Sequence, residues 1–236
     1  IINGNSLPKV EKLIDRLTAI EGMKSISINQ NTKKTNVILG DVTKCIWGDP
    51  YITDMIHLRD TKDFSLTDTA VAYHISPQSF YQVNPVQTEK LYSLALDYAG
   101  LTGKEKVIDA YCGTGTIGLI AASQAKEVIG VELNRDAVKD AVINAKRNNI
   151  KNEQFYNADA GKFMVELSEQ NKKVDVVFMD PPRAGSDEAF LSSVVKLAPK
   201  KVVYVSCNPE TLARDLKYLT RHGYQACLLY TSPSPR

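Results

Sequence analysis

Cys207 lies where a buried strand is followed at once by a helix, in the segment KKVVYVSCNPETLARD of residues 200–215. Asn208 is a suitable helix cap and Pro209 a suitable first-turn residue, so Cys207 is expected at a helix N-terminus. The partial positive charge there favours the thiolate, which is the nucleophilic form of cysteine. Cys207 is therefore a candidate for covalent catalysis, and on position alone the alternative is an inert buried cysteine.

A second set of residues is typical of a nucleoside-binding site. Gly113, Gly115 and Gly118 form G-x-G-x-x-G within DAYCGTGTIG, a motif that lets the backbone turn tightly and approach a ligand. Glu132 ends the next apolar run, 23 residues after Asp109, where a carboxylate can accept hydrogen bonds from ribose hydroxyls. The motif fits a dinucleotide or S-adenosylmethionine, and the alternative is a purely structural role for the glycines.

Two further acids end apolar runs. Asp159 could accept a hydrogen bond from an adenine amino group, and its position fits a solvated surface aspartate equally well. Asp180 opens DPPRAG, residues 180–185, in which two prolines stiffen the loop and fix its carbonyls and carboxylate. Arg183 stands where methyltransferases that act on amino groups carry an aromatic residue, which argues against an exocyclic amine as the target.

A parallel sheet is needed to bring these residues together. From Asn84, which is expected to cap a helix reaching about Tyr98, apolar runs and helical segments alternate. The runs span residues 106–111, 127–132, 153–159, 174–180 and 201–206, and the helices that follow them begin near residues 116, 135, 160, 187 and 209. Near-continuous apolar strands indicate a doubly wound α/β domain of the Rossmann type. Ligands of this fold bind beyond the carboxyl ends of the strands.

Residues 1–75 predict a separate, small α/β domain. The segment 8–22 has the apolar spacing of a helix, and residues 25–31, 35–40 and 70–76 read as short strands. We see no catalytic cluster in this part of the chain. We therefore expect it to pack against the catalytic domain or to orient the substrate.

Composition excludes several classes of protein. The 236 residues carry 29 basic and 27 acidic side chains, a balance that neither demands nor excludes an RNA partner. The four cysteines are far apart and form no C-x-x-C pair, which argues against a zinc site or a disulfide framework. No apolar run is long enough to span a membrane and no leader is visible, so we expect a cytoplasmic protein. Because the chain begins at Ile1, we expect a piece of a longer protein.

Five segments occur together and in order: FYQVNP, DAYCGTGTIG, GVE, DPPRAG and VSCNPETLARD. Over about residues 76–224 the set resembles the RNA uracil-5-methyltransferase family, whose members make 5-methyluridine in 23S ribosomal RNA or in tRNA. The resemblance implies S-adenosylmethionine as methyl donor and an RNA partner, with 23S ribosomal RNA preferred over tRNA. It implies Cys207 as the nucleophile and Arg183 beside it. The residues expected around the cofactor are Gln82, Tyr111, Gly113, Glu132, Asp159 and Asp180.

The chemistry of this family accounts for the residue types. Addition of the Cys207 thiolate to C6 of uracil produces an enolate whose C5 can attack a sulfonium methyl group. A base must then remove the C5 proton so that the thiolate can leave. The target base must be flipped out of its stack, which costs least in single-stranded loops.

Two departures from the family pattern bear on these expectations. The iron–sulfur cysteine cluster and the N-terminal oligonucleotide-binding module of many members have no counterpart here, so we expect no metal. The chain ends in ACLLYTSPSPR, where the family continues with further strands and a glutamate base. We interpret residues 229–236 as a non-native tail and residues 76–228 as a catalytic domain truncated at its C-terminal end, and we nominate no base.

Three rival functions remain open from the sequence. One is a methyltransferase acting on another base or on protein, and another is an RNA-binding relic whose catalytic domain is incomplete. The third is a nicotinamide-dependent dehydrogenase, which has no obvious need for the DPPRAG loop. We expect a monomer in each case.

Overall fold

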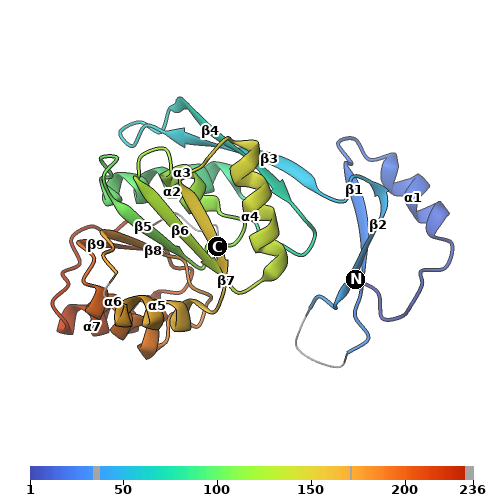
Figure 1. Ribbon diagram of the computed structural model, residues 1–236. Helices are drawn as coiled ribbons and strands as arrows, with labels where there is room; N and C mark the ends of the chain where they lie inside the picture. The colour runs from blue at the N-terminus through green and yellow to red at the C-terminus, as the bar shows by residue number, and fades with distance from the viewer. Residues whose placement is uncertain (34–37, 171, 232–236) are drawn as a thin grey trace.

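A five-stranded parallel sheet forms the centre of the protein in the computed structural model, which describes residues 1–33, 38–170 and 172–231 (Figure 1). The strand order is β7-β6-β5-β8-β9, so the order reverses between β5 and β8, where ligands of this fold bind. This confirms the predicted doubly wound sheet. The strands are β5 (Lys106–Ala110), β6 (Glu127–Glu132), β7 (Glu153–Asn157), β8 (Val176–Met179) and β9 (Lys201–Tyr204).

The helices that cross between these strands begin where the capping residues predict. Asn84, Asn134 and Asn208 each accept a hydrogen bond from a first-turn backbone N–H of the helix that follows. In the same way, Asp159 caps the helix that begins at residue 160, and Asp187 caps the helix that begins at residue 188. The helices are α2 (Pro85–Ala99), α3 (Thr116–Ala121), α4 (Arg135–Arg147), α5 (Ala160–Glu169), α6 (Glu188–Leu197) and α7 (Pro209–Arg221).

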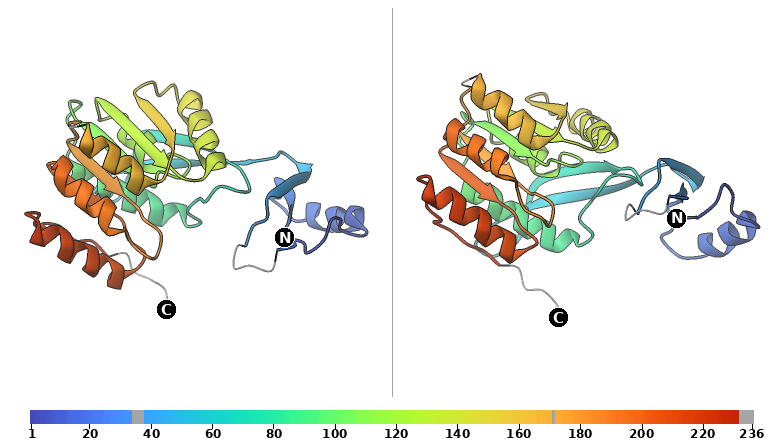
Figure 2. Two further views of the ribbon diagram at one scale, coloured as in Figure 1. Left: turned by 60° about the horizontal axis from the view of Figure 1, so that its bottom comes forward. Right: turned by 90° about the horizontal axis from the view of Figure 1, so that it is seen from below.

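The two faces of the sheet are covered by different helices, as the views in Figure 2 show. Val107 and Phe178 face a core cluster that includes side chains of α2, α3 and α4. Ile108 and Val177, their neighbours along the strands, face a second cluster with α5, α6 and α7. Alternation between two buried faces explains why these strands read as unbroken apolar runs.

A β-hairpin of β3 (Ile52–Arg59) and β4 (Leu66–Ile75) packs on the first of these clusters. Ile56 and Tyr73 are fully buried there, and Glu89 of α2 accepts hydrogen bonds from the His57 N–H and the Arg59 guanidinium. The domain boundary expected between residues 75 and 76 would separate the hairpin from this packing. We therefore propose a boundary near residue 50.

Side chains of α4 cover the outer edge of β4 in a regular series. Asn148 bonds both the N–H and the carbonyl of Ala72, at 2.9 and 2.8 Å. Asn144 does the same for His74, and Asp140 accepts from the N–H of Ser76 at 2.9 Å. The three polar residues, four apart on the helix, therefore replace a neighbouring strand and protect the edge from pairing with another chain.

The N-terminal part lies beside this body and consists of α1 (Val10–Thr18), β1 (Ser25–Gln30) and β2 (Val42–Gly48) (Figure 1). The strand predicted over residues 35–40 is wrong in its described part. Residues 35–37 lie outside the described residues, and Ile38 to Gly40 form no strand. Asn29 bonds both the N–H and the carbonyl of Gly40, so the chain bends here and β2 begins two residues later.

No helix in the described ranges is long and apolar enough to cross a membrane.

Candidate active site

The candidate residues meet at one rim, because each follows the carboxyl end of a parallel strand. Tyr111 directly follows β5, Asp180 directly follows β8, and Glu132 is the last residue of β6. Cys207 comes three residues after the end of β9. Since β6, β5, β8 and β9 are consecutive neighbours in the sheet, these four residues lie along one edge of it.

The glycine loop and Glu132 are bonded to each other. The Gly113 N–H donates to Glu132 Oε2 at 3.0 Å, and the Asn134 N–H donates to Oε1 at 2.7 Å. The carboxylate is thereby held in one orientation with lone pairs left for a ligand. Apart from its two chain neighbours, a Cβ added at Gly113 would meet no protein atom within 4 Å, so the space beside this residue is open.

Two distant side chains support the glycine loop from behind. The Tyr73 hydroxyl, from β4, donates to the carbonyl of Thr116 at 2.9 Å. Asn144 of α4 donates to the carbonyl of Thr114 at 3.1 Å. Sequence reasoning missed both residues, because nothing in the pattern of either element identifies a partner 30 or more positions away.

Gln82 and Asp180 both influence the hydroxyl group of Tyr92 in α2. Tyr92 is 3% exposed, and burial raises the pKa of its hydroxyl well above the ordinary value. The negative charge of Asp180 raises that pKa further, and a hydrogen bond with the Gln82 side chain lowers it. Tyr92 was missed because its spacing in α2 is that of an ordinary core residue. Burial also raises the pKa of Asp180 itself, to about 6.

A pair of buried carboxyl groups lies beneath the loop. Asp109 Oδ2 accepts from the Gly118 N–H at 2.7 Å, and burial raises the pKa of Asp109 to about 8. Burial and the charge of Asp109 raise the pKa of Glu153 well above its usual range. A Cβ at Gly118 would collide with Glu153 Oε1 and lie 3.0 Å from Asp109 Oδ2, so glycine is required there.

Cys207 is exposed and lies one residue before the cap of α7. Asn208 accepts from the Glu210 N–H at 3.0 Å, and its amide nitrogen donates to the carbonyl of Arg183 at 3.2 Å. Cys207 and Arg183, whose side chain is also exposed, are therefore held near each other. Cys112, by contrast, is 5% exposed and burial raises its pKa. Burial, which the alternative of an inert cysteine requires, is thus found at Cys112 and not at Cys207.

Asp159 is placed differently from the other predicted residues. Its Oδ1 accepts from the Lys162 N–H at 3.0 Å and so caps α5. A role toward the cofactor would have to use its remaining lone pairs, and that role stays a prediction. Across the described ranges, no three His, Cys, Asp or Glu side chains gather as metal ligands do.

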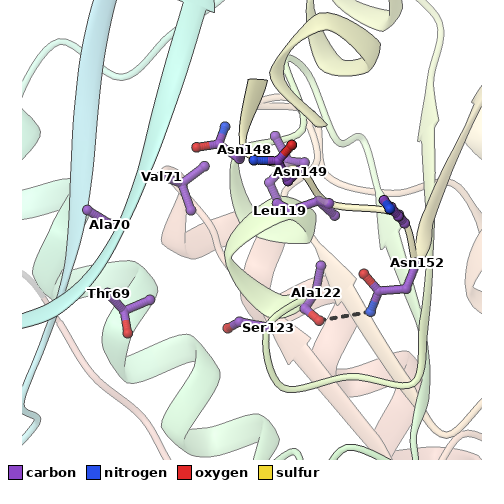
Figure 3. Close-up of a pocket in the computed structure, with 11 residues that line it drawn as sticks. Thr69, Ala70, Val71, Leu119, Ala122, Ser123, Asn148, Asn149 and Asn152 are labelled. Atoms are coloured by element: carbon purple, nitrogen blue, oxygen red, sulfur yellow. Dashed lines mark hydrogen bonds between the residues drawn. The ribbon is translucent and has the colours of Figure 1, made fainter. Parts of the chain in front are cut away.

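A groove of about 560 Å³ lies elsewhere, between β4, the end of α3 and the connection from α4 to β7 (Figure 3). Its lining includes Ser123, which follows α3, and Asn152, which precedes β7. These positions belong to the amino ends of the strands, opposite the rim that carries Cys207. The groove is therefore separate from the candidate active site.

The chemistry of the rim favours a particular class of ligand. Two carboxylates, Glu132 and Asp180, together with the Gln82 amide can bind hydroxyl and ammonium groups. The Tyr111 ring adds an apolar surface against which a planar base can pack. The residues present therefore fit a nucleoside that carries positive charge.

Comparison with known proteins identifies similar sequences and structures. The model of the tRNA (uracil-5-)-methyltransferase family matches residues 53–231. Uncharacterized RNA methyltransferases of Halalkalibacterium halodurans and Caldanaerobacter subterraneus are 50% and 46% identical over 226 residues, each match covering 95% of this chain and 47% of the relative. The chain thus spans about half the length of these curated relatives.

Two solved structures show the same arrangement of elements. The tRNA (uracil-54, C5)-methyltransferase of Pyrococcus abyssi, in complex with S-adenosyl-L-homocysteine, superposes with a TM-score of 0.65 and is 32% identical, over 92% of this chain and 48% of that one. Precorrin-6y C5,15-methyltransferase from Geobacter metallireducens has a TM-score of 0.54 at 18% identity, over 63% of this chain and 77% of that one. The second likeness shows the fold alone.

Proposed function

Because the chain belongs to the tRNA (uracil-5-)-methyltransferase family, we propose that it transfers a methyl group to C5 of a uridine in RNA. The observation that carries this proposal is the position of Cys207, exposed at the start of α7 on the rim that also bears Glu132 and Asp180. An exposed nucleophile beside a nucleoside pocket is what a covalent methyl transfer to a pyrimidine ring requires. A cytoplasmic setting would keep the thiol reduced.

The cofactor of the proposed reaction is S-adenosylmethionine, whose demethylated product occupies the Pyrococcus abyssi neighbour. Glu132, already oriented by two backbone N–H groups, would bind the ribose hydroxyls. Gln82 and Asp180 would bind the amino acid portion, Tyr111 would pack on the adenine ring and Gly113 would leave it room. Asp159 would bind the adenine amino group. When bound, the cofactor supplies an electrophilic methyl group on a sulfonium.

Cys207 carries the covalent step of the proposed mechanism. Its sulfur bonds to C6 of uracil, and the electron pair of the C5–C6 double bond moves onto C5 and O4. C5 then accepts the methyl group and afterwards loses its proton to a base. Loss of that proton restores the double bond and releases the Cys207 thiolate. Arg183, held beside Cys207 through Asn208, would donate to the oxygen on which negative charge develops. We assign no residue of this chain to the base.

A mechanism-based trap tests the covalent step. RNA containing 5-fluorouridine has no proton to lose at C5 after methylation, so the adduct to Cys207 persists through a denaturing gel. The test uses the full-length protein, in which the residues keep the numbers of this chain. It is expected to form a shifted band only with S-adenosylmethionine present. Cys207→Ser should abolish the band. Cys227→Ser removes another exposed cysteine and is the matched control, expected to leave it unchanged.

The RNA itself is the finer part of the proposal. We propose 23S ribosomal RNA, in a loop from which a uridine can be flipped out at low cost, with tRNA as the alternative. The Pyrococcus abyssi protein, by its name, acts on tRNA. Fragments of 23S ribosomal RNA and whole tRNA transcripts, each containing 5-fluorouridine, distinguish the two. A band with tRNA alone would transfer the proposal to tRNA, and no band with either would favour an RNA-binding protein without this activity.

A further inference from the structure

We propose that Arg214 and Asp215 are positioning residues that clamp the loop of residues 180–186 to α7 and thereby set Arg183 against Cys207. The inference rests on the proposed function for the reaction that the clamp serves. The contacts that form the clamp are independent of that function.

Arg214 ties two carbonyl groups of the loop to the helix. Its Nη2 donates to the carbonyl oxygens of Ala184 at 2.9 Å and Ser186 at 3.0 Å. Its Nε donates to Asp215 Oδ1 at 2.8 Å, which holds the planar guanidinium in the orientation that both carbonyls need. The side chain of Arg214 is 56% exposed, so the attraction between the two charges alone explains little of the arrangement.

Asp215 completes the clamp from inside the protein. It has no exposed surface, and its Oδ2 accepts from the Ser186 N–H at 2.9 Å and from the Tyr204 hydroxyl at 2.8 Å. A buried carboxylate is tolerated only when its oxygens are bonded and its charge is balanced, and Arg214 supplies the balance. Asp215 therefore connects the loop, β9 and α7 at one point.

Earlier turns of α7 hold the beginning of the loop. Asn208 and Thr211 both donate to the carbonyl of Arg183, each at 3.2 Å. Their spacing with Arg214 puts all three on one face of the helix. The loop approaches this face closely at Gly185, whose φ is 75° and where a Cβ would collide with Arg214 and Asp215 side-chain atoms. The loop fits against α7 only because this residue is glycine.

The sheet does not fix these residues by itself. The last backbone bond between the two chain segments joins the Val205 N–H to the carbonyl of Met179 at 2.9 Å. Beyond it, Arg183 lies on one segment and Cys207 on the other. Side chains of α7 are what connect the segments there. Because a displacement of about 1 Å can cost about a hundredfold in rate, the clamp would determine how well the site is assembled.

The clamp also reaches Tyr111, one of the residues proposed to bind the cofactor. The Ser186 hydroxyl lies 3.3 Å from the Tyr111 hydroxyl, while its backbone is bonded by both clamp residues. Tyr111 would therefore be affected only through a single bond between hydroxyl groups. Asp180 precedes the residues that the clamp contacts, and its own N–H is bonded to the carbonyl of Ala110 in β5 at 3.5 Å. We accordingly expect the clamp to act mainly on the step carried by Cys207 and little on cofactor affinity.

Single-turnover kinetics with the complete protein, S-adenosylmethionine and 5-fluorouridine RNA test the proposal. Arg214→Lys keeps the charge beside Asp215 and loses the fork that binds two carbonyls. We expect the rate constant for adduct formation to fall about tenfold to a hundredfold at full amplitude, with the affinity for S-adenosylhomocysteine within threefold of the wild type. Arg221→Lys, exposed on the last turn of the same helix, is the matched control and should change neither.

A merely structural role would give a different result. Lost folding lowers the amplitude, which counts active molecules, and leaves the rate constant of the remaining molecules unchanged. That outcome, or a wild-type rate constant in Arg214→Lys, would overturn the proposal. Arg214→Ala gives a second check, since millimolar guanidinium chloride should restore part of its rate and an equal concentration of sodium chloride should not.

Hydrogen exchange separates the clamp from the proposed function. The Ser186 amide is bonded to Asp215, so it should exchange slowly in the wild type and at least tenfold faster in Asp215→Ala, whose side chain has no acceptor for it. Equal exchange in both proteins would refute the clamp even if methylation is observed. Protected exchange in a protein that forms no adduct would refute the proposed function and leave the clamp intact.

Discussion

Asp180 is a carboxylate whose burial brings its pKa to about 6, within the pH range in which ligand affinity can be measured. If the ionised form binds the cofactor, affinity for S-adenosylhomocysteine should rise about tenfold from about pH 5 to about pH 7, as the group loses its proton. Titration calorimetry measures the change. Asp180→Asn cannot ionise at this position and should bind more weakly, with a flat pH profile.

A change of affinity with pH in the opposite direction would assign Asp180 a different role. Affinity that falls between these pH values would mean that the protonated carboxyl group donates to the ligand. A pH profile in Asp180→Asn that is as steep as in the wild type would transfer the titration to another group.

Asp109 makes the stability of the protein depend on pH. Its folded-state pKa, about 8, lies above the ordinary value of 3.8, so the folded protein holds a proton that the unfolded chain releases. This contribution to stability is complete below about pH 4 and is lost as the pH rises through about 8. Asp109→Asn keeps an acceptor for the Gly118 N–H and removes the titration. Relative to the wild type it should gain about 1–3 kcal/mol in free energy of unfolding between about pH 5 and about pH 8.

Urea denaturation at the two pH values measures this difference, with Asp97→Asn on the surface of α2 as the control. An equal change of stability with pH in Asp109→Asn and in the wild type would show that Glu153 holds the proton alone. Glu153→Gln should then produce the gain.

Residues at strand ends could be predicted from the sequence, because position in a parallel sheet determines which side chains meet. Glu132 and Cys207 were found in this way and lie on the common rim. Tyr92 and Asp215 could not be found, because their contacts join segments that are separate in the sequence and their own patterns are those of core and helix residues. Asp159 was also predicted from its place at a strand end, but the structure shows that this position caps a helix as well.

At the scale of elements, the series of α4 side chains on β4 is open to a direct test. Asn144 is buried and bonds the N–H and carbonyl of His74 and the carbonyl of Thr114. Asn144→Ala leaves these buried groups unpaired and should cost about 1–3 kcal/mol in the free energy of unfolding. Lys146→Ala, exposed two residues along the helix, should stay within about 0.5 kcal/mol of the wild type.

A loss in Asn144→Ala no larger than in the control would mean that water replaces the missing bonds. Because the same side chain supports the glycine loop, affinity for S-adenosylhomocysteine should fall together with stability. Unchanged affinity would limit the role of Asn144 to the edge of β4.

The elements of the parallel sheet were predictable and those of the N-terminal third were only partly so. Strands buried on both faces produce apolar runs, and their helices begin at recognisable caps. β3 alternates its apolar residues with Asp54, His57 and Arg59, and β2 carries Lys44, so neither has that pattern. Each of these strands is half exposed and is stabilised by pairing with a neighbouring strand. The sequence does not reveal that pairing.

At the scale of the whole molecule, the hairpin should be indispensable to the catalytic body. A chain of residues 51–236 keeps β3, β4 and the buried Ile56 and Tyr73, and we expect it to unfold in one cooperative transition. A chain of residues 76–236 loses these core side chains and exposes α2, so it should be aggregated or lack a cooperative transition. Calorimetry and size-exclusion chromatography of the two chains make the comparison.

Cooperative unfolding of the shorter chain would restore the boundary near residue 75. Failure of both chains would mean that β1 and β2 also contribute to the fold of the body.

The spacing of the α4 side chains along the helix differs slightly from the spacing of the β4 residues that they bond. Four residues of helix advance about 6.0 Å, while two residues of antiparallel strand advance about 6.8 Å, so each rung falls short by about 0.8 Å. The three successive contacts described above tolerate this mismatch in spacing. A fourth contact would join residue 152 to Ala70, but α4 ends at Arg147. Asn152, in the connection to β7, bonds the carbonyls of Ala122 and Ala125 instead, and Figure 3 draws the bond to Ala122. The groove at Thr69 and Ala70 thus lies beyond the end of α4, where its series of contacts with β4 stops.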